Sequence, residues 1–438
     1  MPLAFCLSYC ILAAMREELE AVYESVHAWC RARGYAGHDP FDALNSRLFQ
    51  STPLRRSRLA RLAWTQILKR SPVNLRALAL IPAGRNPKGT ALFALASLSR
   101  MRAARGARDA REVRALLDEL LDSRVRSPRG HGAWGYNFDW QGRSFYAPRG
   151  TPAVVPTAFA VRALVEGAQA TGVAEGKHEL NTDAGKYLEA ARGACEFILR
   201  DLKRADESEE EVCFSYTPLD RTRVFNASLL AGEALAQVGA LTGETELNAH
   251  ALRATRYVVR RQRDDGSWAY GADSYQSWSD NFHTAFVLTS LARILKTRGR
   301  KFKSDAVKEH ESAAVKKHYA DGDEIRRAIG RGYEFWRSSF FLADGWPKYY
   351  HHSAHPADAH SAGAAVVACA ELRDIEPGAQ ELAARVARWA VRELFDRRGF
   401  FYYQKRRLYT ARTPYMRWSQ AWMMYALARL LEGMRAEG

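Results

Sequence analysis

The chain has 438 residues, of which 47% are hydrophobic and 26% charged, as in ordinary globular proteins. Its formal net charge of +16 favours an anionic partner such as an acidic glycan, a diphosphate lipid or a membrane surface. Arginines on solvated helix faces are the plainer explanation of that charge. Nucleic acid is excluded as a partner, because the sequence has no zinc-finger spacing, RNP-like run or basic tail.

The N-terminal residues 1–14 are apolar, but no basic segment precedes them and they are too short to span a bilayer. They are interpreted as an apolar N-terminal segment or an overextended start, with the first charged helix beginning at Met15. The six cysteines have irregular spacing and form no CxxC, which is typical of core residues in a reducing compartment. These features predict a cytoplasmic protein, with weak association with a membrane surface as an open alternative.

Six times along the chain, an amphipathic charged stretch leads through a loop rich in Gly and aromatic residues into an Ala-rich apolar stretch. The charged stretches predict helices near residues 15–34, 109–126, 184–203, 244–263, 323–341 and 379–398. The apolar stretches open at Thr90-Ala91, Thr157-Ala158, Asn226-Ala227, Thr284-Ala285, Ser361-Ala362 and Gln420-Ala421, and residues of these types near a helix start predict N-caps. A helix that is apolar all round is a buried helix, so the second set is expected inside the first.

This alternation predicts an all-α fold, an (α/α)6 toroid of six helical hairpins in one domain over residues 15–438. Insertions are expected near residues 54–85 and 299–320, where the sequence is basic and breaks the repeat. In such a ring the inner helices run parallel, so their N-termini and the long loops meet at one rim. That rim, the mouth of the ring, is the predicted location of the functional site and favours anionic ligands.

The candidate catalytic residues lie in the loops or at the inner-helix starts: Asp139, Asp280, His283, His360 and Tyr409. An epimerase or lyase would use His283 or His360 as the base and Tyr409 as the proton donor. Arg417 would then neutralise a substrate carboxylate. A hydrolase would instead pair Asp139 with Asp280. The structural alternatives are that Asp280 is a helix cap and that His283 is a packed core histidine.

Aromatic and polar loop residues are the candidates for substrate binding, because sugar faces and isoprenoid cations both favour aromatic rings. The set is Trp134, Tyr136, Asn137, Trp140, Arg143, Trp268, Tyr270, Asn281, Trp346, Tyr350, His355, Arg417 and Trp418. Packing of these rings between helix ends is the alternative. The histidines between residues 351 and 360 match no zinc spacing, so no metal is predicted. Without a Walker A or dinucleotide motif, no cofactor is predicted either.

The segment RATRYVVRRQRDDGSWAYG resembles the QW repeat of squalene-hopene and oxidosqualene cyclases. The matching positions are Arg253, Ala254, Tyr257, Val258, Gln262, Gly266 and Trp268. In that family the motif ties an outer helix to the next loop, so the resemblance implies a toroid. The acidic DxDD motif of those cyclases is absent, and the zinc-binding trio of the related prenyltransferases cannot be assembled. A terpenoid cyclase-like enzyme therefore stays as an alternative.

Six-hairpin glycosidases, polysaccharide lyases and uronyl epimerases share this predicted toroid. The ending PYMRWSQAWMMYALARLL resembles that of glucuronyl C5-epimerases at Arg417 and Trp418. The stretches WGYNFDWQGR and TPAVVPTAFAVRAL resemble bacterial proteins found beside surface-polysaccharide genes. The resemblances imply a carbohydrate-active enzyme, an epimerase, lyase or hydrolase, that modifies a surface glycan or its lipid-linked precursor. A non-catalytic glycan-binding toroid is the other alternative.

Overall fold

A computed structural model describes residues 2–104, 107–142, 145–171, 183–305 and 313–436. Within these ranges, six long helices form an inner set: α4 (Pro87–Ala104), α6 (Val154–Ala170), α8 (Phe225–Thr242), α10 (Asn281–Asp305), α12 (Ala359–Leu372) and α14 (Trp422–Ala436). Six more form an outer set: α1 (Pro2–Arg31), α5 (Ala107–Asp122), α7 (Asp183–Arg200), α9 (Thr245–Val259), α11 (Ala313–Phe340) and α13 (Ala379–Leu394).

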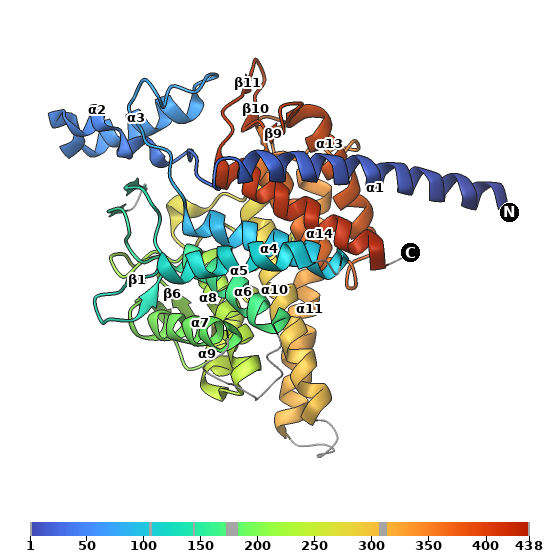
Figure 1. Ribbon diagram of the computed structural model, residues 1–438. Helices are drawn as coiled ribbons and strands as arrows, with labels where there is room; N and C mark the ends of the chain where they lie inside the picture. The colour runs from blue at the N-terminus through green and yellow to red at the C-terminus, as the bar shows by residue number, and fades with distance from the viewer. Residues whose placement is uncertain (1, 105–106, 143–144, 172–182, 306–312, 437–438) are drawn as a thin grey trace.

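The inner helices form a closed ring. Each packs against the inner helices before and after it, and α14 closes the ring by packing against α4. Each inner helix also packs against the outer helix that follows it in the chain, and α14 packs against α1 (Figure 1). The predicted (α/α)6 toroid is therefore confirmed. The Ala-rich sequence of the inner helices explains their close approach, because their alanines are almost fully buried.

Several boundaries differ from the sequence-based expectation. Helix α1 is continuous from Pro2 through Met15, and its N-terminal half extends beyond the body of the molecule (Figure 1). The inner helices begin one or more residues before the predicted Thr, Asn and Ser caps, which lie inside the first turns. Asp280 and Asp358 cap α10 and α12 instead, because their carboxylates accept hydrogen bonds from the backbone N–H groups of His283 and Ser361. The predicted insertion near 299–320 includes residues 306–312, which lie outside the described residues.

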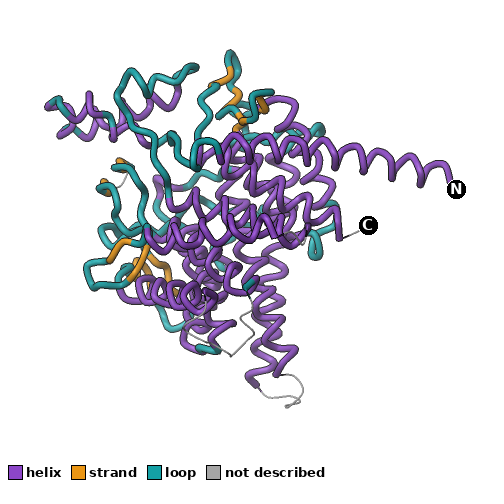
Figure 2. The backbone as a smooth tube through the Cα atoms, viewed as in Figure 1, coloured by secondary structure: helices purple, strands orange, loops and turns teal. Residues whose placement is uncertain are grey.

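Short antiparallel strands stiffen the loops that surround the mouth of the ring (Figure 2). The two-stranded pairs are β1 (Val125–Arg126) with β2 (Gly132–Ala133), β3 (Trp140–Gln141) with β4 (Tyr146–Ala147), β5 (Arg204–Glu207) with β6 (Val212–Phe214), and β8 (Phe395–Asp396) with β9 (Phe400–Phe401). The hairpin of β10 (Gln404–Lys405) and β11 (Thr410–Ala411) pairs with β7 (Ala357–Asp358), with Gln404 opposite Asp358. This pairing fixes the start of α12 against the last loop.

Residues 38–83 form a separate small lobe at the mouth, called the mouth lobe below. A backbone bridge between Gly37 and Gly84 closes its base. It contains the 3-10 turns η1 (Asp42–Asn45) and η2 (Pro53–Arg56) and the helices α2 (Arg47–Gln50) and α3 (Arg58–Arg70). Its own core is small: Ala43, Leu68, Ala79 and Ile81. The basic insertion predicted near 54–85 is thus a folded element.

Buried ion pairs fill the ring away from the mouth. Arg162 of α6 donates two hydrogen bonds to Glu233 of α8. Arg293 of α10 donates to Glu166 of α6 and to Glu371 of α12, and Glu371 also accepts from Arg429 of α14. These side chains lie in the later turns of the inner helices, whose first turns are almost free of charge.

The QW-like segment has a structural role in this fold. The amide of Gln262 donates to the carbonyls of Gly266 and of Ala328 in α11, both at 2.9 Å. Gly266 has a φ of +86°, and a Cβ there would lie 2.4 Å from the carbonyl oxygen of Arg331. The ring of Trp268 is buried, and its Nε1 donates to the Val258 carbonyl of α9. The segment therefore ties α9 to its loop and to α11.

No helix in the described part of the chain is both long enough and apolar enough to cross a membrane. The cysteines with described side chains, Cys30, Cys195, Cys213 and Cys369, are unpaired and buried, as expected for core residues.

Candidate active site

The first turn of α10 positions an Asp–His pair at the mouth of the ring. One carboxylate oxygen of Asp280 accepts the backbone N–H of His283 at 3.0 Å, which caps the helix. The other oxygen lies 2.7 Å from Nδ1 of the His283 ring and also accepts from Nε1 of Trp278. Asp280 is buried, whereas the His283 side chain keeps 23% of its accessible surface. Asp280 is therefore both a cap and an orienting partner for a reachable imidazole.

His360, in the first turn of α12, also contacts the Phe282 ring. Its imidazole is stacked on Trp418 at 4.0 Å between ring centres, and it lies 4.5 Å from the centre of Phe282. The ring centres of Phe282 and His283 are 4.0 Å apart. Neither ring nitrogen of His360 has a hydrogen-bond partner among the described residues, although both are buried. Burial, together with the neighbouring positive charges of Lys88 and Arg417, holds the pKa of His360 well below its usual value.

Lys88, in the first turn of α4, places its ammonium group among aromatic rings from three other inner helices. The nitrogen lies 4.4 Å from the ring centre of Phe159, 4.9 Å from Phe286 and 5.3 Å from Trp422. Burial, reinforced by the charge of Arg417, holds the pKa of Lys88 well below its usual value. These rings and the lysine form the floor of the mouth, next to His360.

Two further cations approach this floor from the loops. Arg417 lies in a π-helical turn (Met416–Ala421) before α14 and donates two hydrogen bonds to Asp39, at 2.6 and 2.8 Å. Lys69, at the end of α3, places its ammonium group 4.2 Å from the ring centre of Phe41, and burial lowers the pKa of Lys69 to about 8. The mouth lobe therefore supplies both a cation and a counter-ion to the centre of the ring.

Asp358 is the second buried carboxylate near the floor. It accepts the backbone N–H of Ser361 at 2.8 Å and Nε1 of Trp418 at 3.3 Å. Burial raises the pKa of Asp358, while these hydrogen bonds oppose the rise. Its contact with Trp418 fixes the indole ring on which His360 is stacked.

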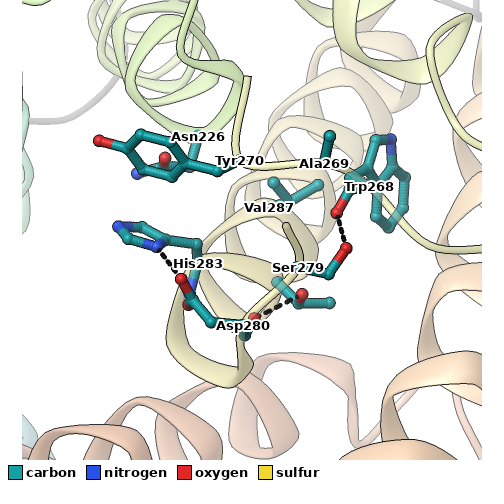
Figure 3. Close-up of a pocket in the computed structure, with 9 residues that line it drawn as sticks. Asn226, Trp268, Ala269, Tyr270, Ser279, Asp280, His283 and Val287 are labelled. Atoms are coloured by element: carbon teal, nitrogen blue, oxygen red, sulfur yellow. Dashed lines mark hydrogen bonds and ion pairs between the residues drawn. The ribbon is translucent and has the colours of Figure 1, made fainter. Parts of the chain in front are cut away.

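The space beside the Asp280–His283 pair is narrow. Figure 3 shows it bordered by Tyr270, Asn226, Ser279 and Val287, with the His283 ring pointing towards Tyr270. Its free volume is about 10 Å³, enough for about one water molecule. Any ligand larger than a water molecule therefore needs the residues around this space to move aside.

The predicted residues Tyr136, Trp140 and Tyr270 all lie at the mouth. Tyr136 is hydrogen-bonded through its hydroxyl to Tyr216, and the Arg417 guanidinium lies 5.3 Å from its ring centre. Trp140 packs against Tyr136 and Tyr216. Tyr270 is stacked on Trp278, with 4.6 Å between its ring centre and that of His283. The structure thus brings together Tyr270, Asp280, His283, His360, Arg417 and Trp418.

Three predicted substrate-binding residues are instead used for packing. Trp134 is fully buried and its Nε1 donates to the Leu120 carbonyl. The ring of Trp268 points away from His283 and is held as described above (Figure 3). Asn281 is fully buried, with its amide bonded to the Lys348 carbonyl and to Trp336. Each of these polar atoms already has an internal partner, and a role of the three residues as substrate contacts stays a prediction.

Arg417 forms a bidentate ion pair with Asp39, and its predicted contact with a substrate carboxylate stays a prediction. Asp139 accepts from the Tyr146 hydroxyl and the Arg149 backbone, so it organises its own loop. The side-chain oxygen of Asn137 accepts a hydrogen bond from the amide of Asn86, just before α4. The Tyr409 hydroxyl donates to the Arg70 carbonyl of α3 at 2.6 Å, which ties it to the mouth lobe. Arg143 lies outside the described residues.

The remaining predicted residues lie in the loop between α11 and α12. The histidines of this region have different aromatic partners: His352 packs on Tyr350, His355 on Trp346 and His360 on Trp418. Trp346 packs against His355 and Trp389, and its Nε1 donates to the Ala354 carbonyl. Tyr350 is stacked on His352. Among the described residues, no three His, Cys, Asp or Glu side chains converge in a way that could hold a metal ion.

Sequence reasoning missed Lys88, Lys69 and Asp39. Lys88 had a visible signal, because it is a lone charge in the first turn of an otherwise apolar stretch, NPKGTALFAL. Lys69 and Asp39 had none, since their role depends on how the mouth lobe folds over the ring.

Comparisons with known proteins find this ring in solved structures, whereas no family model and no curated protein matches the sequence. Cellobiose 2-epimerase from Bacillus thermoamylovorans B4167 is similar over 80% of this chain and 88% of its own, with a TM-score of 0.56 and 12% identity. A possible GH105 family member from Salmonella enterica has a TM-score of 0.58 and 11% identity, over 97% and 95% of the two chains. A D-mannose isomerase has a TM-score of 0.53 and 10% identity, over 80% and 88%. At these identities the likeness establishes the fold.

Proposed function

We propose that the protein is a carbohydrate-active enzyme that transfers a proton at a carbon atom of its sugar substrate, as epimerases, isomerases and lyases do. The observation that carries this proposal is the arrangement of two imidazoles around Phe282 at the mouth. One of them, His283, is oriented by Asp280, and the other, His360, is buried with both ring nitrogens unpartnered. Similar folds are described as an epimerase and an isomerase, which agrees with this chemistry.

The Asp280–His283 pair is suited to act as a general base. A carboxylate at Nδ1 favours the tautomer with the proton on that nitrogen, so Nε2 keeps a lone pair for proton abstraction. Burial lowers the pKa of His360 and so favours its neutral form, and neither ring nitrogen has a hydrogen-bond partner among the described residues. We infer that it exchanges a proton with a substrate that enters the mouth. Two groups able to exchange protons near one binding position are what an epimerisation or isomerisation requires.

The surrounding charges favour an anionic intermediate. Removing a proton next to a carbonyl or carboxylate group places negative charge on oxygen, and the side-chain amines of Lys88 and Lys69 approach the same floor, where Arg417 is already paired with Asp39. Trp418 and Tyr270 offer ring faces for a sugar. With the net charge of +16, these cations support an anionic glycan as substrate, and we assign the enzyme to a bacterial surface polysaccharide or its lipid-linked precursor.

The alternative functions fit this geometry less well. Hydrolysis by Asp139 and Asp280 needs two available carboxylates, but both oxygens of each already accept hydrogen bonds. A terpenoid cyclase stabilises carbocations, and a buried lysine among the aromatic rings opposes that charge. A pure binding protein has no need of an imidazole oriented by a carboxylate.

Solvent isotope exchange tests the proposal directly. Reducing disaccharides, hexoses and uronates are incubated with the enzyme in deuterium oxide, and incorporation of deuterium next to the carbonyl or carboxylate carbon is followed by NMR. The wild-type protein should label at least one of these substrates. His283→Gln and Asp280→Asn should each reduce labelling by about 10²- to 10⁴-fold, the usual contribution of a general base.

Asp139→Asn serves as the control, because it removes a carboxylate of the neighbouring loop and should leave labelling within about twofold of wild type. If glycosidic bonds are cleaved without deuterium uptake, and if Asp139→Asn abolishes that cleavage, the hydrolase alternative is correct and the proton-transfer proposal is wrong.

A further inference from the structure

The mouth lobe has an unusually apolar exterior. Of the twelve large hydrophobic side chains that are exposed in the described part of the chain, seven lie in this lobe: Leu48, Leu54, Leu59, Ile67, Val73, Leu78 and Leu80. Its own core is too small to bury them. Scattered exposed leucines are ordinary, but a concentration of them on one small element marks an interaction surface.

Helix α3 presents part of this surface as a continuous stripe. Leu59, Ala63 and Ile67 are spaced four residues apart and are all exposed, so they share one face of the helix. Leu59 is 77% and Ile67 58% exposed, while Leu68 on the opposite face is buried in the lobe core. Leu408, 91% exposed, precedes Tyr409, whose hydroxyl holds the end of α3. The stripe thus continues towards the β10–β11 hairpin.

The charge of the lobe surface has only one sign. The acidic residues of residues 38–83 are Asp39 and Asp42, and both are buried in ion pairs, with Arg417 and with Arg76. The exposed residues Arg47, Arg55, Arg56 and Arg70 form no ion pair with any described residue. Arginines beside exposed leucines on an amphipathic helix are typical of surfaces that bind anionic lipid headgroups and the acyl chains below them.

We propose that the mouth lobe docks the protein on the surface of an anionic lipid bilayer, with the apolar stripe of α3 inserted at the headgroup level and the arginines on the lipid phosphates. Nucleic acid would satisfy the arginines but would leave the leucine stripe exposed to water. Docking would bring the mouth of the ring near the bilayer, because Lys69 of the lobe lies 5.7 Å from the ring centre of Trp418 at that mouth. This inference is independent of the reaction proposed above.

The test is flotation of the full-length protein with lipid vesicles. Vesicles of phosphatidylcholine mixed with phosphatidylglycerol should carry the protein upward, vesicles of phosphatidylcholine alone should carry much less, and added salt should release it. Leu59→Gln combined with Ile67→Gln should weaken partitioning by about tenfold or more, since two large apolar side chains no longer insert. Arg55→Gln combined with Arg56→Gln should weaken it on anionic vesicles alone.

Leu219→Gln combined with Leu342→Gln is the matched control, since both side chains are exposed but lie outside the lobe. This control should float like wild type, and circular dichroism should be unchanged in all variants. Absence of flotation with anionic vesicles overturns the proposal, and so does equal flotation of lobe and control variants. A wild-type dimer that the α3 variant dissociates would assign the stripe to a second copy, and binding to duplex DNA without flotation would assign the arginines to nucleic acid. Either result contradicts bilayer docking.

Discussion

Lys88 is a buried cation that no carboxylate of the described residues contacts in an ion pair. It is surrounded by Phe159, Phe286 and Trp422, whose ring faces compensate only part of the lost hydration. The lowered pKa of Lys88 expresses this cost, because burial disfavours its charged form. A fold that keeps such a group at the floor of its mouth sacrifices stability there, as functional sites commonly do.

Replacement of Lys88 by methionine should therefore stabilise the protein and inactivate it. We expect Lys88→Met to raise the free energy of unfolding near pH 7 by about 1 kcal/mol, because the aliphatic stem is kept and the buried charge is removed. The unfolded chain keeps the lysine proton up to about pH 10.5, whereas the native chain loses it at a lower pH. The wild-type protein therefore gains stability as the pH rises, and the stability difference between Lys88→Met and wild type should shrink. Denaturant titrations between pH 7 and about pH 10.5 measure this stability difference. A Lys88→Met variant less stable than wild type would contradict the view that burial of Lys88 costs stability.

Among the elements, the mouth lobe is the one most easily displaced. Besides the Asp39–Arg417 pair, side-chain hydrogen bonds join Arg61 to Gln141, Asn45 to the Asn137 carbonyl and the Tyr409 hydroxyl to the Arg70 carbonyl. The backbone N–H groups of Arg412 and Met416 donate to the carbonyls of Pro72 and His38, and Phe41 packs against Trp418. The inner helices, in contrast, are buried over most of their length. Elements with few buried contacts open first, so we expect this lobe to open before the ring does.

Tyr409→Phe should loosen this lobe without affecting the ring. Loss of the hydrogen bond to Arg70 removes about 1 kcal/mol of local stability, so amide hydrogens of α3 should exchange about fivefold faster. Hydrogen-exchange mass spectrometry of peptides covering residues 58–70 measures this change. Tyr187→Phe, which removes a comparable hydrogen bond to Asp118 between α7 and α5, is the control and should leave α3 unchanged. Equal exchange in α3 of wild type and Tyr409→Phe would mean that the hairpin does not restrain the lobe.

At the scale of the whole molecule, the ring was predictable because its signal is local. An Ala-rich stretch without charge in its first turns is a buried helix wherever it falls, and all of the predicted inner helices form. The helix starts were less predictable, since Asp280 and Asp358 cap their helices from positions before the Thr and Ser types that the sequence favours. The mouth as the site location follows from the parallel inner helices.

The chemistry within the mouth could be predicted only in part. His283, His360 and Trp418 precede or begin apolar helices, so their convergence follows from the topology. The pair of Arg417 with Asp39 joins residues 378 positions apart and has no local signal. Trp134 and Tyr270 both follow the Gly/aromatic loop pattern, yet one is a packing residue and the other lies beside His283, because helix-end geometry decides which ring is enclosed.

The ion pairs away from the mouth make the whole ring sensitive to acid. Burial would raise the pKa of Glu166, but Arg293 and Arg102 together lower it to about 2. The folded-state pKa is thus below the ordinary value of 4.5, so this stabilisation is fully present above about pH 4.5 and is lost as the pH falls towards 2. Arg293 also pairs with Glu371, whose pKa is lowered in the same direction. Helices α6, α10 and α12 are therefore coupled through one guanidinium.

Arg293→Met should break this coupling and should cost more than the loss of any surface pair. Two buried carboxylates would lose their shared partner, and the loss should stay below the about 3–5 kcal/mol of a buried charge left unpaired, because Glu166 keeps Arg102 and Glu371 keeps Arg429. The acid transition should move to higher pH, because Glu166 would then protonate closer to its ordinary pKa. The native and unfolded chains would then take up this proton over a similar pH range, so the stabilisation that Glu166 supplies above that range is smaller.

Arg192→Met, which removes the exposed pair with Glu244, is the control and should cost about 0–1 kcal/mol. Urea titrations measure the free energy of unfolding, and acid titrations followed by circular dichroism measure the pH of the acid transition. Equal losses in the two variants would show that the ring gains nothing from its internal ion pairs.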